Sequence, residues 1–468
     1  MKSPNTLMDK EEPFAKRMKT RIGLAATLML AVLALGLTGT PAAAAENAVV
    51  HWSGIAEGAI AVGRPPASCS VLAGMVHGAM YDAVAAIEKG LAPFATSVTS
   101  PPDASADAAV AQAARDVLTA RVPGQAAAVQ TAYDAYMALI PDGPAKDGGK
   151  AVGAAAAAGM LAMRTGDHFD DVVPYVQPTP GPGVFEPIAT TPPVDTKLPF
   201  VRPFTYGSPS DYRPGGPLEL SSRRYARDVA EVQELGRVDS TTRTAEQTET
   251  VRFYTDQTFV QYSRALRGLV NALGLDLRES ARLLGYVHVS TADTMIATWE
   301  AKYHYYFWRP NHAIQRADTD GNPATLPDTT WLPLVTGNHP EYPSGHACFT
   351  AAVTASLRNY FGTKHVPIAI SSTVVGTTRT YQSLDEIVAD VEDARVWGGL
   401  HYRTTMTQSA KHFTQIARDI GRRHFLADKR GHDDDDDHDN DRHDNDHDDD
   451  DDDRDGRDDH GRGGKRGH

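Results

Sequence analysis

Cysteine is scarce in this chain of 468 residues, which contains Cys69 and Cys348 and no others. Two cysteines are too few for a disulfide framework. They could pair once in an oxidising compartment, or each could be a small buried thiol, so no disulfide is predicted. The chain also lacks a basic stripe that could neutralise phosphates, which gives no reason to expect nucleic-acid binding.

Long apolar runs are absent as well, except for one near the start. Residues 22–37 are almost wholly apolar and follow four cations between positions 16 and 21. The run is short for a membrane span, and the alanines at 43–45 suit a signal peptidase, so we predict a signal peptide over 1–45, cleaved after Ala45. An uncleaved anchor is the alternative. We expect a secreted, soluble mature protein without a membrane span.

Negative charge is concentrated at the C-terminal end. The formal net charge is −14, and residues 431–468 contain 18 Asp against six Lys or Arg, which supply −12 of it. This segment has no apolar residues for a core and its like charges repel, so a disordered tail over 429–468 is predicted. Its role would be solubility, or loose binding of divalent cations.

Residues 46–428 are long enough for one large domain or two closely packed halves. Apolar residues three and four positions apart predict helices over roughly the following ranges: 67–88, 104–121, 124–139, 147–164, a stretch from 222, 245–272, 347–360 and 405–425. The sequence has no fixed repeat, no Gly-rich phosphate loop after a strand and no alternation of strands with helices. The predicted fold class is therefore all-α.

Local signals set the ends of several elements. A capping box at 276–279 opens a long helix that runs to about Phe307 and is ended by Pro310, and a second capping box at 383–386 opens another helix. Between 168 and 218 the chain is rich in Pro and Gly, which excludes regular helix. A segment of that length is a lid, a rim of a binding site, an interface arm or a packed irregular wrap.

Three separate segments carry the polar groups expected of a site. The first, 302–310, places Lys302 and Arg309 seven residues apart, which on one helix projects two cations from one face among aromatic residues. Two such cations are costly to desolvate unless an anion lies between them.

The second segment, 339–347, starts a helix at Pro343 and Ser344. The first amides of a helix lack partners within it, and an oxyanion can satisfy them. The Gly345 amide can approach closely because no Cβ intervenes, the Ser344 hydroxyl adds a donor, and His346 would stand beside the anion.

The third segment, 395–403, combines the planar guanidinium of Arg395 with Gly398 and Gly399, which break a helix before His401. Together the patterns Lys-x6-Arg-Pro, Pro-Ser-Gly-His and Arg-x3-Gly-x-His resemble the signature shared by vanadium haloperoxidases, type 2 phosphatidic-acid phosphatases and bacterial acid phosphatases. Their order and all three internal spacings match.

The resemblance implies a helical-bundle fold, with the motifs within 302–401, and a vanadate cofactor. Vanadate oxygens would be held by Lys302, Arg309, Ser344, Gly345 and Arg395. His401 would be the nitrogen ligand of vanadium, and His346 would be the acid-base group. The implied partners are hydrogen peroxide, a halide and a small organic acceptor, and a homodimer is a candidate assembly because helical relatives often form dimers.

Two further functions stay open. In a phosphatase, His401 would attack phosphorus while His346 protonates the leaving alkoxide. A degenerate, non-catalytic oxyanion-binding protein is the third hypothesis. The long irregular segment, the large helical body before the motifs and the export signal resemble soluble bacterial haloperoxidases. His339, seven residues before His346, occupies a place where bromide-oxidising relatives carry His, which favours bromide or iodide; a helix-flanking His is the alternative.

The chain departs from the family at one place. Four residues after the active-site His, the family usually has an Asp that orients the imidazole, and here that residue is Thr405. A hydroxyl can accept the same hydrogen bond without the charge, which weakens the phosphatase hypothesis more than the haloperoxidase one. Asp82 and Asp293 are candidate substitutes as carboxylate partners of the cations, or else buried structural carboxylates.

Overall fold

The computed structural model of the chain describes residues 20–23, 46–188 and 192–426. The predicted acidic tail, and the predicted signal peptide apart from residues 20–23, lie outside the described residues. All described residues belong to one compact unit. Most of them are helical, as predicted.

The helices follow the sequence pattern closely. Their bounds are α2 Ala48–Ile60, α3 Pro66–Ile87, α4 Ala106–Arg121, α5 Ala126–Met137, α6 Pro144–Met163, α7 Arg223–Leu235, α8 Ala245–Phe253, α9 Thr258–Leu273, α10 Leu277–Tyr305, α11 Pro310–Gln315, α12 Gly345–Phe361, α13 Leu384–Trp397 and α14 Arg403–Ile420. The predicted stretch 245–272 is two helices, α8 and α9, separated at residues 254–257. Helices α2 and α11 were not predicted.

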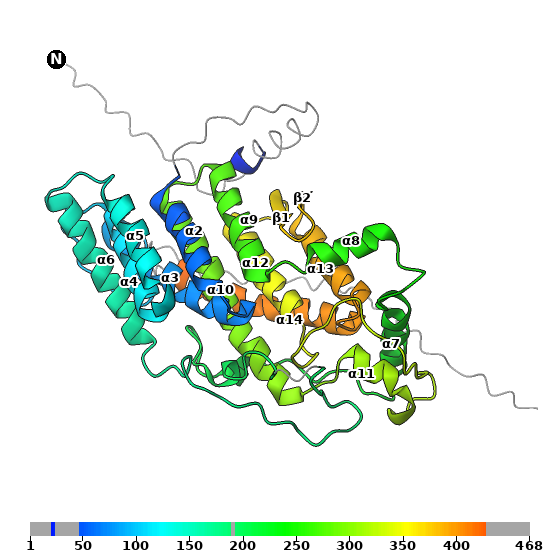
Figure 1. Cartoon of the computed structure of the whole chain (residues 1–468). Helices are drawn as coiled ribbons and strands as arrows, with labels where there is room; N and C mark the ends of the chain where they lie inside the picture. Colours follow the sequence, from blue (N-terminus) through cyan, green and yellow to red (C-terminus); the bar gives the residue numbers. More distant parts are fainter. Residues whose placement is uncertain (1–19, 24–45, 189–191, 427–468) are drawn as a thin grey trace, which may run out of the picture. The chain divides into compact units, whose positions relative to one another are not determined.

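The long helix α10 is the axis of the fold. It packs against α3 on one side and against α12 and α14 on another, while α4 and α6 pack on α3 (Figure 1). A Cβ at Gly74 in α3 would lie 2.9 Å from the Ala292 Cβ in α10, so only glycine permits this close approach. Helix α10 thus runs through the core, and its C-terminal residues lie at the candidate site.

Helix α3 is the one described helix that is long and apolar enough to cross a membrane, and 83% of its most apolar window is buried inside the protein. It is a core helix. Cys69 in α3 and Cys348 in α12 are both buried free thiols, in agreement with the absence of a predicted disulfide.

Both predicted capping boxes are present. The Asp276 side chain accepts a bond from the Glu279 amide at the start of α10, and Ser383 and Glu386 cap α13 in the same way. The predicted end of α10, at about Phe307, lies two residues beyond the observed end. The helix ends at Tyr305, because Tyr306 adopts the left-handed conformation with φ 50°, and Pro310 instead occupies the first turn of α11.

The all-α prediction missed one hairpin. Strands β1, Ile368–Ser372, and β2, Thr377–Tyr381, pair antiparallel between α12 and α13. Both strands are five residues long, a length at which apolar periodicity does not separate strand from helix. The hairpin packs on α9.

The described residues of the Pro- and Gly-rich segment 168–218 are irregular apart from two short 3-10 turns, η2 at Leu198–Phe200 and η3 at Pro209–Tyr212. The segment is pinned to the end of α10: the Val194 carbonyl accepts bonds from Trp299 Nε1 at 3.3 Å and from the Tyr303 hydroxyl at 2.7 Å. The Val194 amide also donates to the Asn338 carbonyl. The described part of this segment is therefore a packed wrap beside the second motif.

Candidate active site

The three motif segments meet where α10, α12 and α13 end or begin. Lys302 lies in the last turn of α10, and Arg309 is the N-cap of α11. Arg395 lies in the last turn of α13, and His401 follows in the loop to α14. Because α10 ends between Lys302 and Arg309, the two cations do not share one continuous helix face as predicted. The turn after Tyr305 brings them together instead.

Two of these cations are held by backbone carbonyls. Lys302 Nζ donates to the carbonyls of Pro340 at 2.8 Å and Glu341 at 3.0 Å. Arg309 Nε donates to the His339 carbonyl, and its Nη1 donates to the Leu400 carbonyl. These contacts tie the first motif to the other two. Neutral carbonyl oxygens accept these hydrogen bonds without supplying a counter-charge, so the positive charges are not paired by these contacts.

Arg395 completes the cationic cluster. Its Nη1 donates to the Tyr254 carbonyl at 3.1 Å, while its Nε is buried without a hydrogen-bond partner among the described residues. Lys302, Arg309 and Arg395 are 0%, 2% and 6% exposed. Burial lowers the pKa of each of the three, and Arg309 lowers the pKa of both Lys302 and Arg395 further. Three close, buried cations are unfavourable until an anion joins them.

The start of α12 supplies backbone donors beside this cluster. Ser344 is the N-cap, and its hydroxyl accepts the Ala347 amide while keeping its own proton for donation. A Cβ at Gly345 would lie 3.2 Å from the Trp299 ring and 3.9 Å from Lys302 Cε, so Gly345 leaves room next to the lysine. The predicted roles of Ser344 and Gly345 fit this geometry.

His346 and His339 lie beside the same cations. His346 Nε2 is 3.0 Å from the Thr258 hydroxyl at the start of α9. Burial and the neighbouring Arg395 lower the pKa of His346. His339 Nδ1 is 2.9 Å from Arg309 Nη2, and the His339 ring lies 5.3 Å from the Trp299 ring. His339 is therefore part of the site and not a remote surface residue.

His401 is 1% exposed and both of its ring nitrogens have partners. Nδ1 lies 2.9 Å from Glu341 Oε1, and Nε2 lies 3.2 Å from Arg309 Nη1. A carboxylate on Nδ1 keeps the proton there and leaves the Nε2 lone pair facing the cations. Burial and the charges of Arg309, Lys302 and Arg395 lower the pKa of His401, which favours the neutral form of the ring.

Glu341 is the residue that sequence reasoning missed. It is fully buried, and its carboxylate lies against His401, Thr405 and the Tyr402 amide. Burial raises its pKa to about 7, while Arg309 and Lys302 act in the opposite direction. Its position between His339 and His346, inside the second motif, was a usable signal. Nothing in the spacing alone showed that it points to the third motif.

For Asp82 and Asp293 the structure supports the second alternative, that of buried structural carboxylates, over the role of partners of the cations. The Asp82 carboxylate accepts the amides of Phe94, Ala95 and Thr96. The Asp293 carboxylate accepts the Phe204 and Thr205 amides and the Thr205 hydroxyl. Both fix chain segments to α3 and α10. Each is a buried structural carboxylate whose hydrogen bonds go mainly to backbone.

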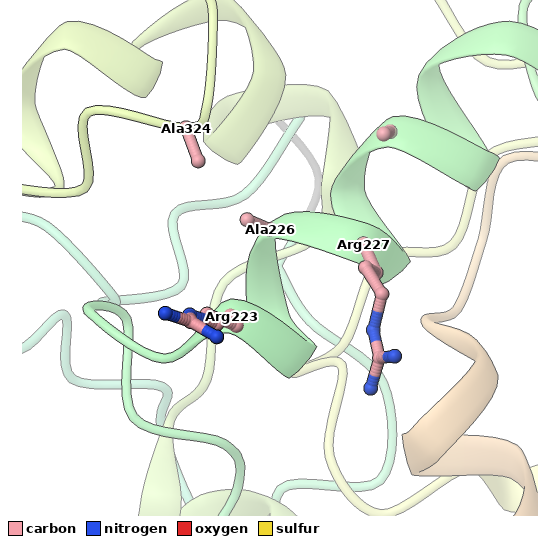
Figure 2. A pocket seen from close by; sticks show the side chains of 5 residues that line it. Arg223, Ala226, Arg227 and Ala324 are labelled. Carbon is pink, nitrogen blue, oxygen red and sulfur yellow. The ribbon is translucent and has the colours of Figure 1, made fainter. Parts of the chain in front are cut away.

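A separate surface hollow, shown in Figure 2, is lined by Arg223, Ala226, Arg227, Ala230 and Ala324. None of the motif residues lines it. Within the described residues no three His, Cys, Asp or Glu side chains are grouped so as to hold a metal cation. The donors of the motif site suit a tetrahedral oxyanion, because they comprise buried cations, an unpartnered Arg395 N–H, helix-start amides and one imidazole lone pair.

Sequence comparison places the motif region in a known family. A family model described as the VCPO second helical-bundle domain matches residues 282–426. The vanadium chloroperoxidase of Curvularia inaequalis is 36% identical over 92 residues, which cover 17% of this chain. The match spans 14% of the length of that relative.

Structural comparison extends the likeness to the whole fold. A bacterial vanadium-dependent iodoperoxidase superposes with a TM-score of 0.69 at 18% identity, covering 90% of this chain and 100% of the other. The holo form of a bacterial vanadium-dependent chloroperoxidase gives a TM-score of 0.64 at 16% identity, covering 83% and 95%. Residues 282–426, which contain the three assembled motifs, therefore match the second helical-bundle domain of vanadium chloroperoxidase, and the chain shares the fold of the vanadium haloperoxidases.

Proposed function

We propose that this protein is a vanadate-dependent haloperoxidase, which oxidises a halide with hydrogen peroxide. The observation that carries the proposal is the placement of the buried His401 ring, whose Nδ1 contacts Glu341 and whose Nε2 contacts Arg309, one of three buried cations. That arrangement provides one nitrogen ligand and a charge-neutralising enclosure for a tetrahedral oxyanion. The family's vanadium-dependent members support the assignment.

Different residues would bind the oxygens and the vanadium of vanadate. Its negative oxygens would be bound by Lys302, Arg309, Arg395, the Ser344 hydroxyl and the Gly345 amide, and its vanadium by His401. When bound, vanadate supplies a Lewis-acidic centre that activates hydrogen peroxide toward a halide. The chain itself contributes the positive potential that binds the group and the burial that excludes bulk water from it.

His346 would take up and return the proton that peroxide must lose. Its Nε2 is held by the Thr258 hydroxyl, and its neutral form is favoured by burial and by Arg395. A neutral imidazole fixed beside an anion site is suited to general-base work. His339, in contact with Arg309, would contribute to halide choice, and we propose bromide or iodide as the substrate together with a small organic acceptor.

Phosphatase activity is the second candidate, because the Glu341 contact also suits a nucleophilic His401. A parallel assay of the apo protein and the vanadate-loaded protein separates the hypotheses. We expect bromination of a phenol indicator that depends on both vanadate and hydrogen peroxide. Phosphate release from a monoester, inhibited by vanadate, would instead support the phosphatase. Vanadate binding with neither activity would support an oxyanion-binding protein.

We also propose that the protein is exported, on the basis of the cations at 16–21, the apolar run 22–37 and the alanines at 43–45. N-terminal sequencing of the protein recovered from the culture medium should then begin at Glu46. Recovery of the intact N-terminus in a membrane fraction would contradict export and support an anchor.

A further inference from the structure

The carboxylate of Glu341 is shared by three donors that all belong to the third motif region. Oε1 lies 2.9 Å from His401 Nδ1 and 3.2 Å from the Tyr402 amide, and Oε2 lies 3.1 Å from the Thr405 hydroxyl. Glu341 itself is 60 residues earlier in the chain than His401. The contact therefore exists because α12 and α14 pack together, and local sequence does not produce it.

These bonds fix the orientation of the carboxylate and the tautomer of the ring. Two donors at Oε1 and one at Oε2 leave the carboxylate no free rotation. Arg309 and Lys302 favour the ionised form of Glu341. An ionised carboxylate only accepts, so the ring proton lies on Nδ1, and Nε2 is left as the acceptor that faces Arg309. Glu341 and His401 are 0% and 1% exposed, so water does not compete for either group.

The identity of residue 405 follows from the same geometry. An aspartate at this position would put a second carboxylate where the Thr405 hydroxyl now donates to Oε2. Two buried carboxylates at hydrogen-bond distance repel each other, and one of them must be protonated. A hydroxyl at this position removes that repulsion and adds a donor. Glu341 is therefore compatible with Thr405, whereas an ionised aspartate in place of Thr405 would conflict with it.

We propose that Glu341, held in place by Thr405, is the positioning residue of His401, so that the orienting carboxylate comes from the second motif and not from position 405. The consequence for vanadate rests on the proposed function, but the geometry does not. Removal of Glu341 should release the ring tautomer and weaken vanadate binding by about 10- to 100-fold, the usual cost of losing such a partner.

The test removes the carboxylate at position 341 and introduces one at position 405. The variants are E341A, the relocation variant E341A/T405D, and E57Q, which removes a partly buried, arginine-paired carboxylate outside the site as a control for stability. Three quantities are measured: the ¹⁵N chemical shifts of the His401 ring without vanadate, the vanadate dissociation constant by equilibrium dialysis, and the melting temperature. Vanadate-dependent bromination is recorded separately.

In wild type we expect the His401 shifts of a single tautomer protonated on Nδ1. E341A should shift these signals toward a mixture of tautomers and weaken vanadate binding. E57Q should change neither the ring shifts nor the vanadate affinity. E341A/T405D should restore most of the wild-type ring shifts and most of the vanadate affinity. Unchanged ring shifts in folded E341A, or no recovery in a folded E341A/T405D, would overturn the inference. The proposed function is tested separately. It fails if the wild-type protein does not bind vanadate, or binds vanadate without brominating the indicator. In either case the ¹⁵N shifts of the His401 ring still decide the role of Glu341.

Discussion

Nη1 of Arg309 lies 3.2 Å from Nε2 of His401, so a buried guanidinium faces the lone pair of a neutral imidazole. This contact joins the first motif to the third, and the Arg309 bonds to His339 join both to the second. A cation beside the ring opposes its protonation, which keeps the nitrogen available as a ligand. The pair holds the site in a form ready to accept an anion.

Replacement of Arg395 by alanine should weaken vanadate binding by about 10- to 100-fold, because a charge-assisted hydrogen bond contributes about 1.5–3 kcal/mol. Its buried Nε has no partner among the described residues, so the lost donor serves no other described group. Equilibrium dialysis measures the effect. Arg358→Ala, at an exposed pair with Asp385, is the control for loss of one positive charge and should leave affinity unchanged. Equal affinities in the two variants would contradict the role of Arg395.

Thr258→Val should reduce the turnover number by about 5-fold, since the hydroxyl that holds His346 Nε2 contributes about 1 kcal/mol. Vanadate affinity should change little, because the Thr258 hydroxyl bonds to the acid-base group and not to a cation that holds vanadate. Steady-state bromination kinetics and dialysis measure the two effects. Thr258→Ser keeps the hydroxyl and should restore turnover. A loss of affinity equal to the loss of turnover would show that Thr258 has another role.

The stacked pair His77 and His288 should make the protein sensitive to acid. Their ring centroids are 3.9 Å apart, and they lie near Arg267, which is paired with Glu57. Burial lowers the pKa of both, that of His288 to about 3 from 6.5. Below pH 6.5 the unfolded chain therefore binds protons that the folded chain does not. The contribution to stability is complete above pH 6.5 and is lost as the pH falls toward 3.

Denaturant unfolding of wild type and His288→Leu between about pH 7 and 4 measures this effect. The wild-type free energy of unfolding should fall more steeply with decreasing pH, by up to about 1.4 kcal/mol per pH unit. Asp82 and Asp293 have pKa values raised to about 6 by burial and act in the opposite direction, so the comparison must be between variants. If the free energy of unfolding falls equally with pH in wild type and in His288→Leu, then His288 does not cause the acid sensitivity.

Cys69 and Cys348 should be inert in the folded protein. Both side chains are buried, and burial raises the pKa of each thiol to about 12, so the reactive thiolate is absent near neutral pH. Treatment with iodoacetamide should modify neither residue under native conditions and both after denaturation without reductant. Intact mass spectrometry counts the added groups. Protection of both thiols after denaturation without reductant would instead indicate a disulfide.

The sequence determined most of the secondary structure and identified the candidate anion donors. Helices with clear apolar periodicity and capping boxes, such as α3, α10 and α13, were predicted within a few residues, because those signals act between neighbours three or four positions apart. The five-residue strands β1 and β2 were missed because so short a run has no distinctive period. Lys302, Arg309, Arg395 and His401 were predicted from motif spacing, and the structure brings them together.

Tertiary structure alone decided which carboxylate serves His401. The family resemblance implied a carboxylate at position 405, where this chain has Thr, and the candidate substitutes were Asp82 and Asp293, both of which bind backbone amides elsewhere. Glu341 reaches the ring only because α12 packs against α14, which brings residues 60 positions apart to within 2.9 Å. Periodicity and spacing report on contacts along one element. A hydrogen bond between two elements depends on how they pack, and that is set by the whole core.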